Sequence, residues 1–224
     1  MKENFIIFEI MENDQIILMA DIISSRNADQ RLLMEDFKAA VREINASKKE
    51  IFLSPLTITL GDEFQGITKG LKEAISIILN FEEKIISTKN PFKLRYVVVE
   101  GAIETPINKE IAYGMMGDGL TRARNNIENL KKSYYRFYFN LKDKQKQNAI
   151  NNLFIALQDI IDNWNPERDY YLVSTFLQYK NYKQVAEVLN KERSLMWKRN
   201  KSLKLDIYQA LKEVADFIGG SENA

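Results

Sequence analysis

Two aspartates occupy positions at which a carboxylate can bind a metal ion. Asp21 ends the apolar segment at residues 15–22, and Asp62 follows Gly61 in a turn between TITL and EFQGI. The chain has no histidine and no cysteine, so disulfides, thiolate metal sites and histidine-based triads are excluded. Carboxylates and backbone carbonyls favour Mg²⁺ or Mn²⁺. We therefore expect Asp21 and Asp62 to hold one of these ions, with the Ile22 carbonyl as a third ligand.

The residues around the two aspartates are of types that contact phosphate. Two carboxylates about 4 Å apart repel by roughly 4 kcal/mol at an effective dielectric near 20, and a divalent cation reverses this repulsion. The segment after Asp21 leads into a helix, where backbone amides and hydroxyls bind phosphates, and Gly61 permits a positive φ. The expected nucleotide-binding residues are Ser24, Ser25, Arg26, Gly61 and Glu63. The alternative is a plain strand end and an ordinary GD turn with local hydrogen bonds.

The elements that must position these acids follow from the hydrophobic pattern. Residues 5–11 and 15–22 are short, β-branched runs that predict strands, and residues 32–44 have helical spacing. A hairpin is expected from residue 51 onward, with Pro55 near an edge or bulge. A helix at 71–86 and a buried strand at 94–105 follow. This order predicts an α+β fold of ferredoxin-like topology, which a helix from Asp118 and an outer strand at 133–141 complete.

The C-terminal part has helical periodicity from residue 144 onward. We therefore expect two domains, at 1–142 and 143–224, with a helix-turn-helix at 181–201. In the latter, Val185, Ala186, Leu189, Leu195 and Met196 would be buried, and Asn190 would be the left-handed turn residue. The second helix would expose DNA-contacting types, namely Arg193, Ser194, Trp197, Lys198 and Arg199. The alternative is a plain helical hairpin whose basic face is only solvated.

Composition and charge restrict the partners of the whole chain. Its 224 residues include 32 Lys and Arg against 31 Asp and Glu, so no strong overall field attracts nucleic acid or membranes. The N-terminal sequence lacks the features of a signal peptide, and no apolar run reaches the roughly 20 residues of a membrane-spanning helix. We expect a cytoplasmic protein that does not bind membranes.

Four segments of the sequence resemble the SatD family of bacterial proteins. They read MADIISSR, TITLGDEFQGI, LRYVVVEGAI and GDGLTRAR, and they lie within about the first 130 residues. Their order also resembles the palm domain of class III nucleotidyl cyclases and GGDEF diguanylate cyclases. In those enzymes a strand-ending aspartate and a hairpin aspartate bind metal, and the resemblance assigns these roles to Asp21 and Asp62. It also implies a palm at 1–142, a nucleotide partner and a homodimer.

The sequence departs from these enzymes at positions that matter for catalysis. Leu60 stands where GGDEF enzymes have a second glycine. The helix that carries an asparagine and an arginine in class III cyclases has Thr121 and Asn125 at those positions. Arg122 or Arg124 is the expected substitute for the catalytic arginine, and Arg124 is the predicted catalytic residue. The alternative for Arg124 is a solvated charge paired with Glu128.

These observations favour a metal-dependent, nucleotide-binding regulatory protein with a DNA-binding helix-turn-helix. Two other functions stay open at this point. One is a Mg²⁺-dependent nucleotidyl cyclase or nucleotidyltransferase, in which two metal ions shared by Asp21 and Asp62 promote nucleotidyl transfer. The other is a structural interaction module without catalysis. The missing asparagine and arginine favour the regulatory protein over the enzyme, and the two retained acids argue against the structural module.

Overall fold

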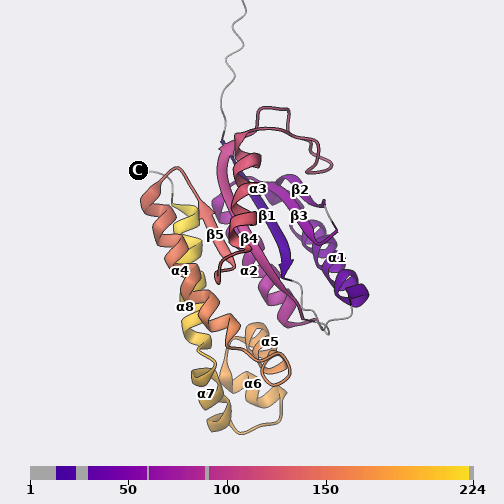
Figure 1. The fold of residues 1–224 in the computed structure, drawn as a ribbon. Helices are drawn as coiled ribbons and strands as arrows, with labels where there is room; N and C mark the ends of the chain where they lie inside the picture. The colour runs from indigo at the N-terminus through magenta and orange to yellow at the C-terminus, as the bar shows by residue number, and fades with distance from the viewer. Residues whose placement is uncertain (1–13, 24–29, 60, 89–90, 222–224) are drawn as a thin grey trace, which may run out of the picture.

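The computed structural model describes residues 14–23, 30–59, 61–88 and 91–221. Its centre is a five-stranded sheet in the order β2-β3-β1-β4-β5, shown in Figure 1. The strands are β1 (Asp14–Ile23), β2 (Phe52–Ile58), β3 (Glu63–Thr68), β4 (Lys93–Ala102) and β5 (Phe137–Asn140). Neighbouring strands are antiparallel except for the parallel pair β4 and β5. The predicted ferredoxin-like order of the first four strands is confirmed, whereas the strand expected at 5–11 lies outside the described residues.

Helices cover both faces of this sheet. On one face, Leu18 and Ala20 of β1 share a core with α1 (Gln30–Ser47) and α2 (Leu71–Ile86). On the other face, Ile17 and Met19 pack against α3 (Asp118–Leu130). Because side chains alternate along a strand, β1 is apolar on both faces, as the uninterrupted apolar run predicts for a central strand. A short 3₁₀ helix at Lys49–Ile51 joins α1 to β2.

The C-terminal helices extend the same core. They are α4 (Lys144–Asp162), α5 (Tyr170–Tyr179), α6 (Tyr182–Val188), α7 (Arg193–Ser202) and α8 (Leu205–Gly220). In Figure 1, α4 and α8 lie side by side next to β5 and α2. Buried residues of α4 and α8, including Phe154 and Tyr208, belong to the same hydrophobic cluster as Phe81 of α2. The core is therefore continuous across residue 142, and the division into two domains stays a prediction.

Side-chain amides occupy the open edges of the sheet. On the edge strand β2, the Asn45 side chain donates to the Leu56 carbonyl (2.8 Å) and accepts from the Leu56 amide (3.0 Å). On β5, Asn151 bonds both backbone groups of Phe139 in the same way, at 2.9 and 3.0 Å. Each asparagine thus takes the place of a neighbouring strand for one residue. The predicted position of Pro55 near an edge or bulge is confirmed, because β2 is an edge strand and its register shift between Ser54 and Thr57 spans Pro55.

Two details of the sequence interpretation are wrong. The outer strand was expected at 133–141, but β5 spans only Phe137–Asn140, because the Tyr134 carbonyl and the Arg136 amide bond the Gln158 side chain instead. Leu195 was expected to be buried, but 45% of it is exposed. Met196, the next residue of α7, is the one that faces the core, and consecutive helical residues point about 100° apart.

Candidate functional site

The tip of the β2–β3 hairpin lies beside the end of β1. The Ile22 amide donates to the Asp62 carbonyl at 2.9 Å, and Gly61 has a positive φ of 85°. The predicted hairpin and the left-handed conformation of Gly61 are thus confirmed. Between Ile22 and Asp62 no bond runs in the opposite direction, from the Asp62 amide to the Ile22 carbonyl. The hydrogen-bond ladder between β1 and β3 therefore ends at this point, and the Ile22 carbonyl accepts no hydrogen bond from the Asp62 amide.

The carboxylate directly across from Asp21 is that of Glu63. The β1–β3 register pairs these two residues, and directly opposite residues share a face of the sheet. Asp21 lies on the face covered by α3, since it alternates with Ile22 and shares its side with Met19. Asp62 is one residue farther along the hairpin and is exposed. The structure thus brings Asp21, Asp62 and Glu63 to the same end of the sheet, and the residue directly opposite Asp21 is Glu63.

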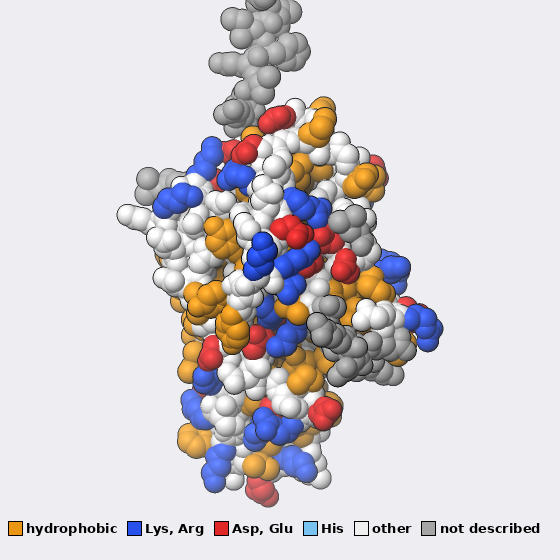
Figure 2. Space-filling view, in the orientation of Figure 1, with side chains coloured by type: hydrophobic (Ala, Val, Ile, Leu, Met, Phe, Trp, Pro, Cys, Tyr) orange, Lys and Arg blue, Asp and Glu red, His pale blue; other side chains and the backbone are white. Residues whose placement is uncertain are grey.

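Three cations surround the two buried acids. Arg95, which lies opposite Asp21 on β4, approaches its carboxylate at 3.3 and 3.5 Å, and Lys131 at the end of α3 lies 3.7 Å away. Arg124 of α3 pairs with Glu63, which also accepts from the Thr59 hydroxyl at 3.3 Å. Figure 2 shows basic and acidic side chains gathered near α3 on this side of the molecule.

Burial raises the pKa of the Asp21 carboxyl. Only 4% of the residue is exposed, and this desolvation raises the pKa of its carboxyl above the ordinary value. Arg95 and Lys131 oppose the effect, and the nearby Glu63 carboxylate adds to it. The pKa of the Lys131 ammonium is raised, mainly by its hydrogen bond to Glu128 and further by Asp21. The attraction of Arg95 and Lys131 therefore does not fully offset the desolvation of the ionised Asp21 carboxylate.

Sequence reasoning missed Arg95 and Lys131 altogether. The signal for Arg95 was present, because an arginine inside the apolar run LRYVVV is unusual unless a buried acid pairs with it. Lys131 carried no comparable signal. Arg124, expected to be a catalytic residue, binds Glu63, and its alternative partner Glu128 binds Lys131 instead. Ser24, Ser25 and Arg26 lie outside the described residues.

The predicted metal ligands at this end of the sheet are the carboxylates of Asp21 and Asp62 and the Ile22 carbonyl. All three are oxygen donors, the type that a hard divalent cation prefers. No cluster of three or more acidic side chains suited to a metal occurs among the described residues. A cation at this place would thus be held by two carboxylates at most, with further oxygen ligands from the backbone, water or phosphate.

The helices α6 and α7 have the turn that was expected between them. Asn190 has a positive φ of 50°, and Val185, Ala186 and Met196 are buried. Arg193, Ser194, Trp197 and Lys198 are exposed on α7, whereas Arg199 departs from its predicted role, as shown next.

Arg199 stabilises the helical part of the chain. Its guanidinium binds the Asp169 carboxylate at 2.6 Å, and Asp169 is completely buried. Arg168 binds the same carboxylate, and this pairing holds the pKa of Asp169 far below its usual range. The prediction that Arg199 is free to contact DNA is therefore not supported, since the residue already has a buried partner.

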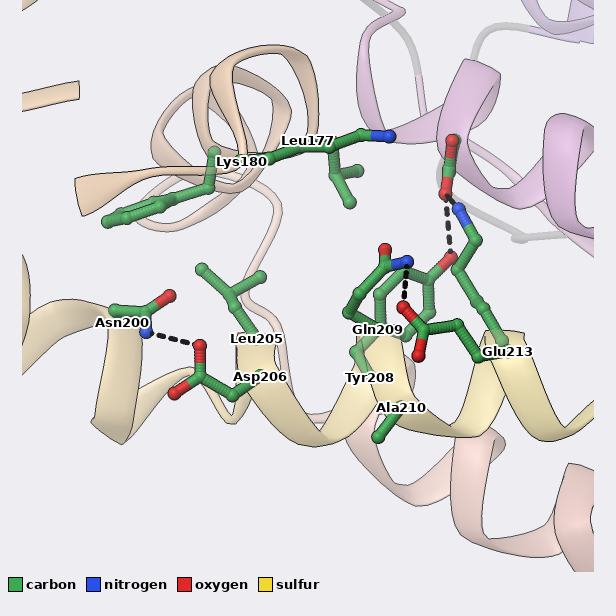
Figure 3. A pocket seen from close by; sticks show the side chains of 12 residues that line it. Leu177, Lys180, Asn200, Leu205, Asp206, Tyr208, Gln209, Ala210 and Glu213 are labelled. Atoms are coloured by element: carbon green, nitrogen blue, oxygen red, sulfur yellow. Dashed lines mark hydrogen bonds and ion pairs between the residues drawn. The ribbon is translucent and has the colours of Figure 1, made fainter. Parts of the chain in front are cut away.

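A separate hollow of about 320 Å³ lies between α5, α8 and the end of α7. At one side of it, Tyr208 of α8, labelled in Figure 3, and Lys212 bond the Glu83 carboxylate of α2. The Asp206 carboxylate faces Asn200 at the other side, at 2.8 Å. The bonds to Glu83 join α2 to α8, and the hollow contains none of the predicted site residues.

No described helix has both the length and the apolar character needed to cross a bilayer.

A search of curated proteins finds no match to the chain. Among solved structures, the catalytic core of a rhodopsin-guanylyl cyclase with converted specificity, in complex with ATPαS, is 19% identical, covers 51% of this chain and 71% of its own, and has a TM-score of 0.38. A bacterial light-regulated adenylyl cyclase is 15% identical, covers 56% and 74%, and has a TM-score of 0.39. The profile of the SatD family matches residues 15–218, nearly the whole chain, and the protein therefore belongs to the SatD family.

Proposed function

We propose that this protein binds a nucleoside triphosphate together with Mg²⁺ or Mn²⁺ at the hairpin end of β1, and that it is a nucleotide-dependent regulatory protein. The observation that carries the proposal is the gathering of acids and cations at one end of the sheet. Asp21 and Glu63 face each other across two strands, Asp62 lies beside them, and Arg95, Arg124 and Lys131 surround them.

The charge arrangement matches a metal–triphosphate ligand. Each buried acid is paired with a basic side chain of the protein, and each of these basic side chains is of a type that binds phosphate. A divalent cation would neutralise the carboxylates and bridge them to phosphate oxygens. Arg95, Arg124 and Lys131 would then contact the phosphates. The ligand thus replaces one set of ion pairs by another, at little cost in unpaired buried charge.

Binding without rapid turnover is favoured by the state of α3. Thr121, at the position of the cyclase asparagine, donates its hydroxyl to the Gly117 carbonyl and is therefore not placed as a free donor for a transition state. Nucleotidyl cyclase or nucleotidyltransferase activity is the alternative, and a silent structural module is the third. The regulatory output is assigned to α6 and α7, whose exposed Arg193, Trp197 and Lys198 suit contact with DNA.

Thermal unfolding with each nucleoside triphosphate and Mn²⁺ tests the nucleotide site. A ligand at about 100 times its Kd adds roughly 2.7 kcal/mol of stability, which raises Tm by about 5–10 °C in a chain of this size. Asp62→Asn should abolish this shift without changing the Tm of the free protein, because the Asp62 side chain is exposed and has no partner among the described residues. Glu192→Gln, another exposed acid at the far end of the molecule, is the control and should keep the shift.

An unchanged Tm with all four triphosphates would refute nucleotide binding. A shift that survives both Asp62→Asn and Asp21→Asn would place the nucleotide elsewhere. To separate the enzyme from the regulator, labelled triphosphate is incubated with the protein and Mn²⁺ and resolved by chromatography. Release of pyrophosphate with a new nucleotide product would establish the enzyme and overturn the regulatory proposal.

Gel shifts with duplex DNA at several salt concentrations test the output helix. Affinity should fall as salt rises, because phosphate contacts release counterions. Arg193→Ala with Lys198→Ala should weaken binding, whereas Lys38→Ala with Lys132→Ala, an equal loss of exposed charge elsewhere, should not. Binding that is independent of salt, or equal in both double variants, would exclude α7 as the DNA contact.

A further inference from the structure

A second charged hollow lies along the open side of β2, away from the acids at the end of β1. It measures about 330 Å³ and has an apolar floor of Phe52, Leu53 and Pro55. Three lysines surround this floor, namely Lys49, Lys69 and Lys109. They come from three separate segments, the 3₁₀ helix, the end of β3 and the connection between β4 and α3.

The backbone that carries these lysines is fixed by hydrogen bonds. The Lys69 amide donates to the Ile51 carbonyl at 3.0 Å, which joins the end of β3 to the 3₁₀ helix of Lys49. Next to Lys109, the Asn108 carbonyl accepts from the Ser54 hydroxyl at 2.5 Å. The three lysines are therefore brought together by the fold, although they are far apart in the sequence.

No acid compensates these three positive charges. No acidic side chain lines the hollow, and none of the three lysines forms an ion pair with any residue that the structure describes. Other lysines of the chain do form such pairs, for example Lys84 with Glu43 and Lys72 with Asp216. Three ammonium groups around one hollow repel each other, and an anion placed among them replaces this repulsion by attraction.

From this convergence we infer that the β2 hollow is a binding site for a small organic polyanion, with at least two phosphate charges and an apolar or aromatic portion. The lysines bind the phosphates as point charges, and the ring or chain packs on Phe52, Leu53 and Pro55. The volume is that of a small-ligand pocket. All three lysines line one hollow of this size, which favours a small molecule over the backbone of a nucleic acid.

This site does not depend on the proposed nucleotide site. Asp21, Asp62 and Glu63 are not among its lining residues, and it has no carboxylate with which to hold a metal. Binding at the β2 hollow should therefore persist in EDTA. A metal-dependent site at the end of β1 should bind no ligand under that condition, because EDTA removes the metal. The two proposals can consequently fail separately.

Titration calorimetry in EDTA with pyrophosphate and with ADP tests the inference. Both should bind saturably with one site per chain, and ADP should bind more tightly because its ring packs on the apolar floor. Changing Lys49, Lys69 and Lys109 all to Gln should weaken pyrophosphate at least tenfold. The matched control changes three exposed lysines outside the hollow, Lys132, Lys183 and Lys191, to Gln, and should alter affinity less than twofold. Since all six lysines are exposed, both variants should fold, which the thermal melt verifies.

Four results would overturn the inference. The first is the absence of saturable binding, and the second is equal weakening in both triple variants, which would indicate general charge attraction. The third is loss of metal-free binding in Asp62→Asn, which would place the anion at the end of β1. The fourth is displacement of bound ADP by duplex DNA in the wild type but not in the triple variant at the hollow, which would identify a nucleic-acid surface.

Discussion

Replacing Glu82 by Gln should destabilise the protein strongly, because it leaves a buried arginine without its main counter-ion. Arg136 and Glu82 have side chains that are only 4% and 5% exposed, and two bonds of 3.1 and 2.9 Å join them. Arg136 also donates to the Leu94 carbonyl at 2.8 Å and lies 3.2 Å from Asp162. Although burial opposes it, this pairing raises the pKa of Arg136, so the guanidinium stays charged.

The size of the effect follows from this geometry. Removing one partner of a buried pair costs about 3–5 kcal/mol, since the other charge stays buried and uncompensated. At roughly 2–4 °C for each kcal/mol in a chain of this length, Tm should fall by about 6–20 °C. Urea unfolding followed by circular dichroism would measure the free energy directly. The nearby surface pair of Glu43 and Lys84 supplies the control, because Glu43→Gln should cost less than about 1 kcal/mol.

The double variant Glu82→Gln with Arg136→Met separates lost attraction from unpaired charge. If the unpaired arginine is the cause, removing it as well should recover part of the stability. The reasoning would be refuted by a cost of less than about 1 kcal/mol for Glu82→Gln. It would be refuted equally by a double variant that is less stable than the single one.

Three further outcomes are expected from single changes. Burial raises the pKa of Asp21 above the ordinary value of 3.8. The stability that its protonated form contributes is therefore fully present below pH 3.8 and is lost as the pH rises through the raised pKa. Asp21→Asn should increase the free energy of unfolding at pH 7 and make that free energy less dependent on pH. Gly119→Ala places a Cβ 2.7 Å from the backbone of β4 and should cost about 1–3 kcal/mol in urea unfolding. Arg199→Ala removes one of the partners of the buried Asp169 and should cost about 1–3 kcal/mol, whereas Lys198→Ala should change the Tm by no more than the equivalent of about 0.5 kcal/mol.

Much of the fold was predictable because its signals are local. The apolar run of β1, the GD turn after β2 and the helical spacing of α2 each follow from a few consecutive residues. The strand order then follows from the sequence of elements, because a split βαβ arrangement allows few topologies. Element ends were less predictable. The short β5 depends on Gln158, which is 22 residues from Arg136 and whose amide side chain has no local signature.

The candidate site was only half predictable for a similar reason. Asp21 and Gly61 are conspicuous because each interrupts or ends a pattern. The pairing of Asp21 with Glu63 depends on the register between β1 and β3, and a shift of one residue would exchange the faces. Lys131 reaches Asp21 from the end of α3, so its role depends on how that helix lies across the sheet. The buried partner of Arg199 was not visible for the same reason, since Asp169 lies just before a different helix, α5.

The asparagines that complete the hydrogen bonding of Leu56 and Phe139 have a consequence for aggregation. A bare outer strand invites another chain to extend the sheet, and successive additions lead toward fibrils. Asn45 and Asn151 bond the edge strands β2 and β5 only after α1 and α4 have docked on the sheet, since each asparagine belongs to one of those helices. A partly folded chain with either helix detached would therefore expose the unpaired backbone groups of an edge strand. Solubility during synthesis should consequently depend on how quickly these two helices reach the sheet.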